Sequence, residues 1–168
     1  MRTEVIELIK GGIGIQYELT VLHFGDERSE RKVYIQGSLH ADEMPGALVS
    51  YYLRQKLEQL ESENRLNVHI ILVPMANPIG MAQSIQYTSF GRFDLFTGRN
   101  FNRLGDLDLY DMTKRQLSDD QVALGQDAQE NTRLIRAAMG KAITAYQPSN
   151  AIESLHHHLV RLAHDADI

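Results

Sequence analysis

Residues 32–75 read KVYIQGSLHADEMPGALVSYYLRQKLEQLESENRLNVHIILVPM, and they predict a strand, a helix and a second strand in succession. The first strand is the run 32–37, which closes at a glycine. Between 44 and 60 apolar residues recur at helical spacing, and Pro45 suits the first turn, where its missing N–H costs nothing. The run 68–75 is almost continuously apolar, as in strands covered on both faces. The three elements therefore predict a right-handed βαβ unit.

The segments on either side of this unit differ in their patterns. Apolar residues alternate at 3–9 and 13–24, with Gly11-Gly12 between the two runs, which predicts an N-terminal hairpin. Residues 76–117 lack a clear period but carry aromatic side chains, among them Tyr87, Phe90, Phe93, Phe96 and Phe101, which argues against disorder. An irregular segment of this length in a compact domain is usually functional.

Two helices are predicted in the last third of the chain. Ser118 and Gln121 have the spacing of a capping box and predict a helix over 118–146. Asn150 predicts the cap of a last helix over 151–166. The order of elements predicts one domain, residues 1–168, of the α/β class: a three-layer α/β/α arrangement around a mixed, largely parallel sheet.

Composition excludes several classes of protein. The 168 residues carry a net charge of −5 and no cysteine, which excludes disulfide frameworks, thiolate zinc fingers and iron–sulfur clusters. The acidic balance does not support a nucleic-acid partner. The longest apolar stretch, 70–75, is far shorter than a membrane span, so we expect no membrane partner and a cytoplasmic protein. The oligomeric state stays open, and a homo-oligomer is compatible with the sequence.

A candidate metal site follows the first strand of the βαβ unit. His40 and Glu43 are three residues apart, so their side chains can converge on one helical turn, and imidazole and carboxylate are ligands of catalytic zinc. The position is favourable, because ligands of open α/β sheets bind beyond the carboxyl ends of strands. The alternative is a loop histidine beside a glutamate that caps the helix.

Basic and amide side chains in the irregular segment form a second candidate group. Arg103 offers a rigid fork for a carboxylate, and Asn102 beside it adds a donor and an acceptor. The alternative for Arg103 is an ion pair with Asp106 or Asp108. Arg92 is a third candidate, and its alternative is a loop arginine paired with Asp94, two residues away.

Taken together, these segments resemble the succinylglutamate desuccinylase/aspartoacylase family of the zinc carboxypeptidase-like superfamily. The blocks that carry the resemblance are GSLHADEMPG (37–46), VPMANPIG (73–80) and GRFDLFTGRNFNR (91–103), in this order. The resemblance covers residues 30–168, and residues 1–29 then correspond to a small N-terminal β extension. It implies a zinc-dependent hydrolase that cleaves an amide bond next to a carboxylate, in an N-acyl amino acid or a short peptide.

The resemblance also implies roles for individual residues. His40 and Glu43 correspond to two of three ligands of one Zn²⁺ ion, and Asn102 and Arg103 to the pair that grips the substrate carboxylate. Arg92 corresponds to the arginine that polarises the scissile carbonyl and stabilises the oxyanion, with Arg99 as the competing candidate.

The family pattern continues beyond Ile168, where its third zinc-binding histidine and its catalytic glutamate are expected. The sequence therefore resembles the N-terminal part of the family. The alternative function is a non-catalytic fragment or remnant that keeps a carboxylate-binding pocket. A nucleotide-binding domain is disfavoured, because the chain has neither G-x-G-x-x-G nor a P-loop motif.

The six histidines other than His40 are alternative candidates for the third zinc ligand. Three consecutive residues of a helix point in three directions, so His156, His157 and His158 are predicted to be structural or solvated. His164 is predicted to be a cation at a helix C-terminus. His23 and His69 are predicted to be strand residues, each with a local partner.

Overall fold

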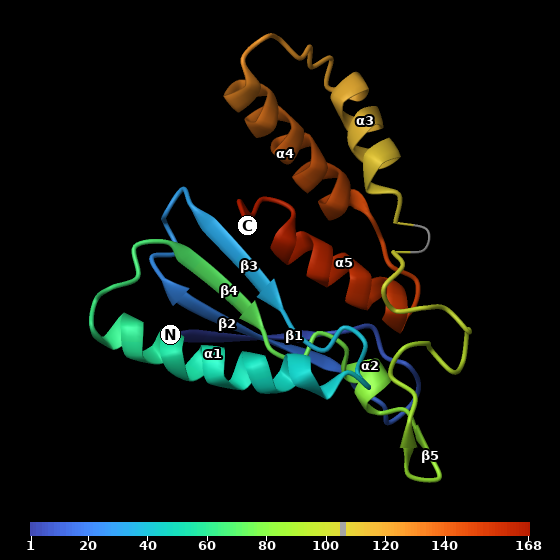
Figure 1. Cartoon of the computed structure of the whole chain (residues 1–168). Coiled ribbons are helices and arrows are strands. Elements are labelled where there is room, and N and C mark those ends of the chain that lie inside the picture. The colour runs from blue at the N-terminus through green and yellow to red at the C-terminus, as the bar shows by residue number, and fades with distance from the viewer. Residues whose placement is uncertain (105–106) are drawn as a thin grey trace.

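The computed structural model describes residues 1–104 and 107–168, whose centre is a four-stranded sheet (Figure 1). The strands are β1 (Arg2–Glu7), β2 (Glu18–Gly25), β3 (Lys32–Gln36) and β4 (His69–Val73), in the spatial order β1-β2-β4-β3. Helix α1 (Met44–Ser62) connects β3 to β4, which pair in parallel. The predicted βαβ unit is thus confirmed.

The sheet is mixed, as predicted, but it is not largely parallel within these four strands. β1 pairs with β2 and β2 pairs with β4, both antiparallel, and only β3 and β4 are parallel among the described strand pairs. The reason is that the N-terminal hairpin, which was expected as a separate extension, joins the sheet directly along β4 through Leu22–Gly25.

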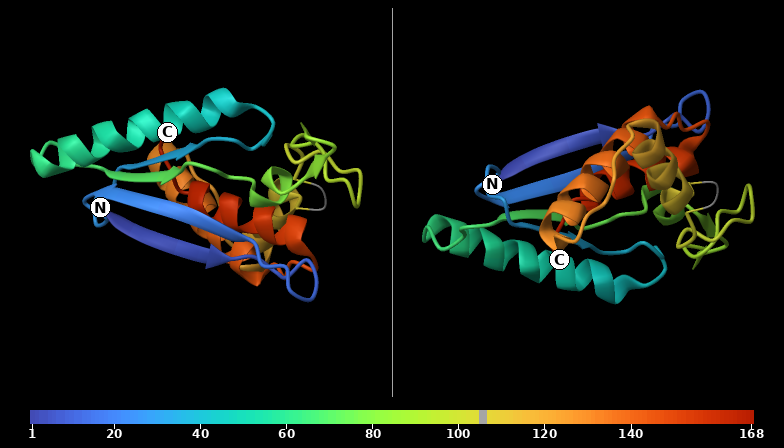
Figure 2. Two further views of the ribbon diagram at one scale, coloured as in Figure 1. Left: turned by 90° about the horizontal axis from the view of Figure 1, so that it is seen from below. Right: turned by 90° about the horizontal axis from the view of Figure 1, so that it is seen from above.

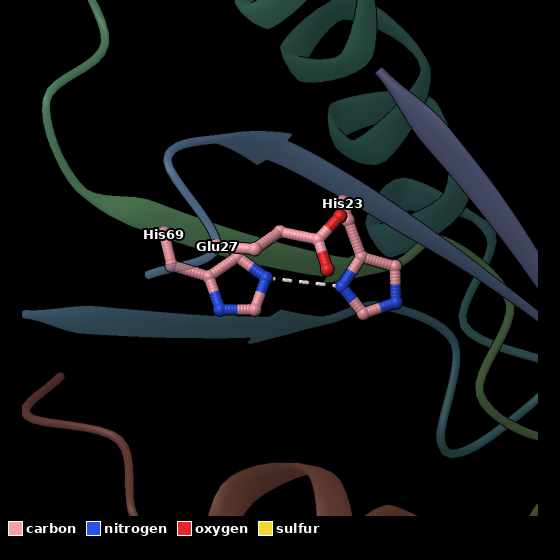
Figure 3. A group of neighbouring side chains, drawn as sticks. All are labelled: His23, Glu27 and His69. Carbon is pink, nitrogen blue, oxygen red and sulfur yellow. Dashed lines mark hydrogen bonds between the residues drawn. The ribbon is translucent and has the colours of Figure 1, made fainter. Parts of the chain in front are cut away.

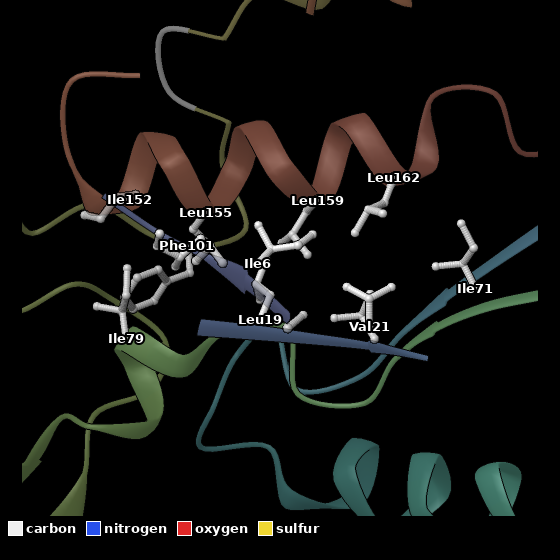
Figure 4. Packing of buried hydrophobic residues seen from close by; sticks show 13 residues of the cluster. Ile6, Leu19, Val21, Ile71, Ile79, Phe101, Ile152, Leu155, Leu159 and Leu162 are labelled. Carbon is white, nitrogen blue, oxygen red and sulfur yellow. The ribbon is translucent and has the colours of Figure 1, made fainter. Parts of the chain in front are cut away.

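Helices cover both faces of the sheet, so the predicted three layers are present (Figure 2). On one face, the residues of α1 pack through Leu57 against Phe24 and Leu72 of the strands. On the other face lies α5 (Ala151–Ala163), whose apolar side chains point at β1, β2 and β4 (Figure 4). Its buried contact residues are Ile152, Leu155, Leu159 and Leu162. Each face buries its own apolar cluster, and both clusters stabilise the fold by removing apolar surface from water.

The first predicted strand of the hairpin is confirmed, whereas the second begins later than expected. Residues 13–17 are not part of β2; Ile13 is fully exposed, and Gly12 and Ile15 form an isolated bridge. Gly14 has a φ of 81°, a left-handed conformation that favours glycine and turns the chain back. The alternation of apolar residues therefore begins at residue 13, before the first residue of β2, Glu18.

The predicted helix over 118–146 is wrong at its start, because two helices occupy this region. Helix α3 (Leu109–Asp119) ends where the predicted helix was to begin, and α4 (Ala128–Ala145) follows after a loop. Ser118 lies in the last turn of α3, and the actual cap of α4 is Asp127, which accepts hydrogen bonds from the backbone N–H groups of Gln129 and Glu130. The capping-box pattern thus lies across the C-terminal end of α3 and not at the start of a helix.

This cap gives a first testable prediction. Asp127→Ala is expected to lower the free energy of unfolding by about 1 kcal/mol, because two N–H groups of the first turn lose their acceptor. Urea denaturation of the variant and of the parent measures the change. Asp119→Ala, which removes the same charge at the last residue of α3, is the control and is expected to change stability by less than about 0.5 kcal/mol. Equal effects of the two substitutions would contradict the capping role.

The remaining elements are short or lie at the end of the chain. Helix α2 (Pro78–Met81) follows β4, and β5 (Ser84–Ile85) and β6 (Thr88–Ser89) form a small hairpin. Asn150 caps α5 by accepting from the N–H of Glu153, as predicted. The last two residues lie beside β3: Asp167 N–H donates to the carbonyl of Lys32, and Tyr34 N–H donates to that of Ile168. No helix within the described residues is long and apolar enough to cross a membrane.

Candidate functional site

The loop between β3 and α1 holds His40 and Glu43 at the carboxyl end of β3. Glu43 is the residue at the N-cap position of α1, but its side chain makes no capping hydrogen bond. Its carboxylate instead lies 3.2 Å (Oε1) from Nδ1 of His40 and also contacts the guanidinium of Arg92. The alternative interpretation, in which the Glu43 side chain caps the helix, is therefore wrong. His40 is mostly buried, whereas the side chain of Glu43 is 54% exposed.

Both ring nitrogens of His40 face oxygen acceptors. Nε2 lies 3.2 Å from Oδ1 of Asn100, which also accepts the backbone N–H of Asn102 at 2.7 Å, and Nδ1 faces the carboxylate of Glu43. If Nδ1 binds a metal ion, the ring proton is on Nε2 and is donated to Asn100. Imidazole Nδ1 and a neighbouring carboxylate then fit the donor set of a divalent metal.

Asn100 was not identified from the sequence. Its Oδ1 lies at Nε2 of His40, the position from which outer partners orient metal-binding imidazoles in proteins. The only sequence signal for it was its place in the block 91–103, next to the two residues that were singled out there. A polar neighbour sixty residues away cannot be assigned to a histidine by spacing.

Arg92 is brought to the same place by a backbone contact between two loops. The N–H of Ala41 donates to the carbonyl of Gly91 at 2.9 Å. A side chain at Gly91 would overlap the backbone nitrogen of Asp42, so the glycine permits this close approach. The next residue, Arg92, thereby reaches Glu43. Asp94, the alternative partner, is buried and accepts hydrogen bonds from Thr97.

Asn77, in the block 73–80, holds the loop that carries His40 in place. Asn77 is fully buried; its side-chain N–H₂ donates to the carbonyl of Leu39 at 2.9 Å, and its oxygen accepts the N–H of Gly80 at 2.8 Å. One side chain thus caps α2 and holds the residue that precedes His40. Since the amide is buried, both of its hydrogen bonds are needed to avoid a cost of desolvation.

A cavity of about 460 Å³ opens beside these residues. It is lined by the loop and the first turn of α1, and by Asn102: Ser38, Leu39, His40, Glu43, Pro45, Gly46 and Asn102. Ser38 has a left-handed φ of 57°, and its hydroxyl is buried without a hydrogen-bond partner among the described residues. Strained backbone and an unsatisfied buried hydroxyl are concentrated at functional sites, and neither was foreseen from the sequence.

Comparison with known proteins identifies the family of the chain. The model of the succinylglutamate desuccinylase/aspartoacylase catalytic domain matches residues 29–142. The chain belongs to the succinylglutamate desuccinylase/aspartoacylase family. This confirms the resemblance seen in the sequence. The family consists of hydrolases of amide bonds.

Two crystal structures of family proteins are similar to the chain along its whole length. A protein from Shewanella amazonensis SB2B is 27% identical with a TM-score of 0.78, and one from Shewanella frigidimarina NCIMB 400 is 23% identical with a TM-score of 0.71. Each alignment covers 99% of this chain, but 45% and 44% of the respective relatives. The chain thus spans less than half the length of these relatives. No curated protein matches it significantly.

The two residues predicted to bind the substrate carboxylate, Asn102 and Arg103, differ in their relation to the cavity. Asn102 lines the cavity, while the guanidinium of exposed Arg103 donates to the carbonyl of Asn102 at 2.6 Å. Of the alternative partners of Arg103, Asp106 lies outside the described residues, and Asp108 caps α3 by accepting the N–H of Asp111. Between the pair and Asn100, Phe101 anchors the segment in the core.

Two of the histidines of α5, His156 and His157, have structural partners, whereas Nδ1 of His158 is buried without a hydrogen-bond partner among the described residues. Nε2 of buried His156 lies 2.8 Å from the carbonyl of Phe101, and Nε2 of His157 lies 2.9 Å from that of Ile143. Burial lowers the pKa of His158 to about 4, so its ring is neutral near pH 7. His164 is the C-cap residue of α5, in agreement with its predicted position at a helix C-terminus.

Proposed function

We propose that the protein is a zinc-dependent hydrolase that cleaves an amide bond next to a carboxylate, in an N-acyl amino acid or a short peptide. The observation that carries the proposal is the close approach of His40 Nδ1 and the Glu43 carboxylate, beside a cavity and an arginine. The family is generally zinc-dependent and acts on small N-acyl amino acids, which supports this choice of metal and substrate.

His40 and Glu43 would hold the zinc ion. When bound, zinc supplies a Lewis acid that polarises a carbonyl and lowers the pKa of water towards 7. Asn100 would then accept the Nε2–H of His40, while Nδ1 binds the metal. Glu43 contributes one carboxylate oxygen, and its contact with Arg92 leaves room for this role because a carboxylate can accept several bonds.

The remaining residues of the site would bind the substrate. Arg92 presents N–H groups next to the two metal ligands, where an oxyanion develops during attack on an amide carbonyl. Asn102 lines the same cavity, and Arg103 follows it with a guanidinium that can turn from a backbone carbonyl to a substrate carboxylate. The unsatisfied hydroxyl of Ser38 offers a further hydrogen bond to a polar group of the substrate.

A zinc titration followed by NMR tests the metal assignment. Addition of Zn²⁺ is expected to shift the imidazole signals of His40, and Glu43→Gln is expected to abolish this shift, because a neutral amide is a much poorer ligand than a carboxylate. Glu58→Gln changes the same charge on the same helix, where Glu58 pairs with Arg54, and is expected to leave the zinc response unchanged. An unchanged His40 response in Glu43→Gln would exclude Glu43 as a ligand.

A further inference from the structure

His23, Glu27 and His69 form a second cluster of side chains that could hold a metal ion (Figure 3). His23 lies near the end of β2, His69 is the first residue of β4, and Glu27 follows β2 in the turn towards β3. The His40 loop instead follows the carboxyl end of β3, which pairs with the end of β4 at Val73. The two groups are therefore separate sites.

The three side chains converge on one point. Nδ1 of His23 lies 3.0 Å from Nε2 of His69, and one ligand atom from each of His23, Glu27 and His69 lies within 4.8 Å of the others. In a tetrahedral zinc site with bonds of about 2.0–2.1 Å, two nitrogen ligands are roughly 3.3 Å apart. The two imidazoles are thus already at almost the spacing that a shared metal ion requires.

Glu4 on β1 orients His23 for this role. Oε2 of Glu4 lies 3.1 Å from Nε2 of His23, so a neutral His23 donates its Nε2–H to this carboxylate and keeps Nδ1 as a lone pair facing His69. A carboxylate on the unliganded nitrogen is the usual outer partner of metal-binding histidines. His69 then donates the hydrogen bond to His23 in this structure, and metal binding would move its proton from Nε2 to Nδ1.

Arginine side chains pair with both carboxylates beside the two imidazoles. Arg2 pairs with Glu27 and with Glu4, and this contact holds the pKa of the Glu27 carboxyl below its usual value. Arg161 also approaches Glu4, with its Nη2 3.9 Å from Oε1, so two arginines match the two carboxylates. Arg2 holds both oxygens of Glu27, and metal binding through Glu27 therefore requires Arg2 to release one of them.

Access to the cluster is open on one side. The ring of His23 is 4% exposed, whereas the side chain of Glu27 is 43% exposed and forms the outer edge of the group. A hydrated ion can therefore reach the imidazoles past Glu27. The buried ring of His23 is thus a fixed ligand, and the partly exposed carboxylate of Glu27 marks the side from which an ion can enter.

We propose that His23, Glu27 and His69 form a second binding site for a divalent transition-metal ion, with Glu4 as the residue that positions His23. Imidazole and carboxylate ligands suit Zn²⁺ and its neighbours in the first transition series better than Mg²⁺ or Ca²⁺. The ion joins β2 to β4 and, through Glu4, to β1. It therefore stabilises the hairpin against the rest of the sheet and takes no part in the hydrolytic site.

Isothermal titration of Glu43→Gln protein with Zn²⁺ tests this site apart from the first one. We expect one equivalent of zinc to bind, and the imidazole signals of His23 and His69, not of His40, to shift in NMR spectra. Glu4→Gln in the same background is expected to weaken binding about 10- to 100-fold. Glu7→Gln, the matched change on the same strand, is expected to leave the affinity unchanged.

Two further measurements separate loss of the site from loss of the fold. Thermal unfolding in EDTA is expected to be nearly the same for Glu27→Gln and its parent, because an exposed ion pair such as Arg2–Glu27 contributes little to stability. Added Zn²⁺ is expected to stabilise the parent more than the variant. If zinc does not shift the signals of His23 and His69, or if Glu4→Gln and Glu7→Gln bind it equally well, the proposal is wrong. Failure at His40 with binding at His23 would overturn only the proposed function.

Discussion

Replacement of Phe101 with alanine is expected to lower the free energy of unfolding by about 3–5 kcal/mol. The Phe101 side chain is 1% exposed and belongs to the larger apolar cluster, near Ile79 of α2 and Leu155 of α5 (Figure 4). Its removal leaves a cavity between these helices in addition to the lost burial of a large ring. Urea or thermal denaturation monitored by circular dichroism measures the effect.

Phe96 is the matched control for this substitution. Its ring is 96% exposed, so Phe96→Ala is expected to change stability by less than about 0.5 kcal/mol. A similar loss in both variants would mean that Phe101 does not anchor the segment in the core. Since Phe101 lies between Asn100 and Asn102, we also expect Phe101→Ala to disturb the His40 signal through its hydrogen bond to Asn100.

The sequence predicted the approach of His40 and Glu43 to each other, but it did not predict the contacts of the irregular segment around them. The spacing of His40 and Glu43 is local, and one turn is enough to bring them together. Arg92 reaches them across forty-nine residues of sequence because of the contact between Gly91 and Ala41, which leaves no periodic signal. The family resemblance supplied this connection, whereas composition and spacing did not.

The same distinction between local and long-range contacts separates correct from incorrect predictions of the fold. The βαβ unit follows from a change in apolar periodicity, which the chain carries within residues 32–75. The joining of β2 to β4 depends on pairing between distant strands, so the parallel share of the sheet was overestimated. For the same reason His23 and His69 were each expected to have a local partner but were not recognised as partners of one another.

Arg92 and Arg99, the two candidates for the arginine that polarises the scissile carbonyl, differ in their surroundings. Arg92 contacts Glu43 and so lies next to His40. Arg99 forms part of the turn that follows, where its carbonyl accepts the N–H of Asp94, and its positive charge contributes to the lowered pKa of His156. The structure therefore places Arg92 beside the proposed metal ligands and Arg99 nearer to α5, which favours Arg92 as the residue that acts on the scissile carbonyl.

Arg92→Ala is therefore expected to lower kcat for hydrolysis of N-succinylglutamate or an N-acylaspartate by about 10²–10³-fold, the usual cost of removing one donor to an oxyanion. Loss of the N–H groups that face the developing charge raises the barrier without removing a metal ligand, so zinc binding at His40 is expected to persist. The rate is measured on the protein in the form that its host produces, with amine release as the readout.

Arg99→Ala distinguishes this role from a general effect of positive charge. It removes the same charge seven residues away and is expected to change kcat by less than about threefold, since a charge that does not touch the reacting atoms acts only through screened electrostatics. Arg92→Lys is expected to recover part of the rate, because an ammonium keeps the charge but not the planar fork of donors. If Arg99→Ala were the slower variant, the two arginines would exchange roles, and the contact between Arg92 and Glu43 would only hold the loop beside the first turn of α1.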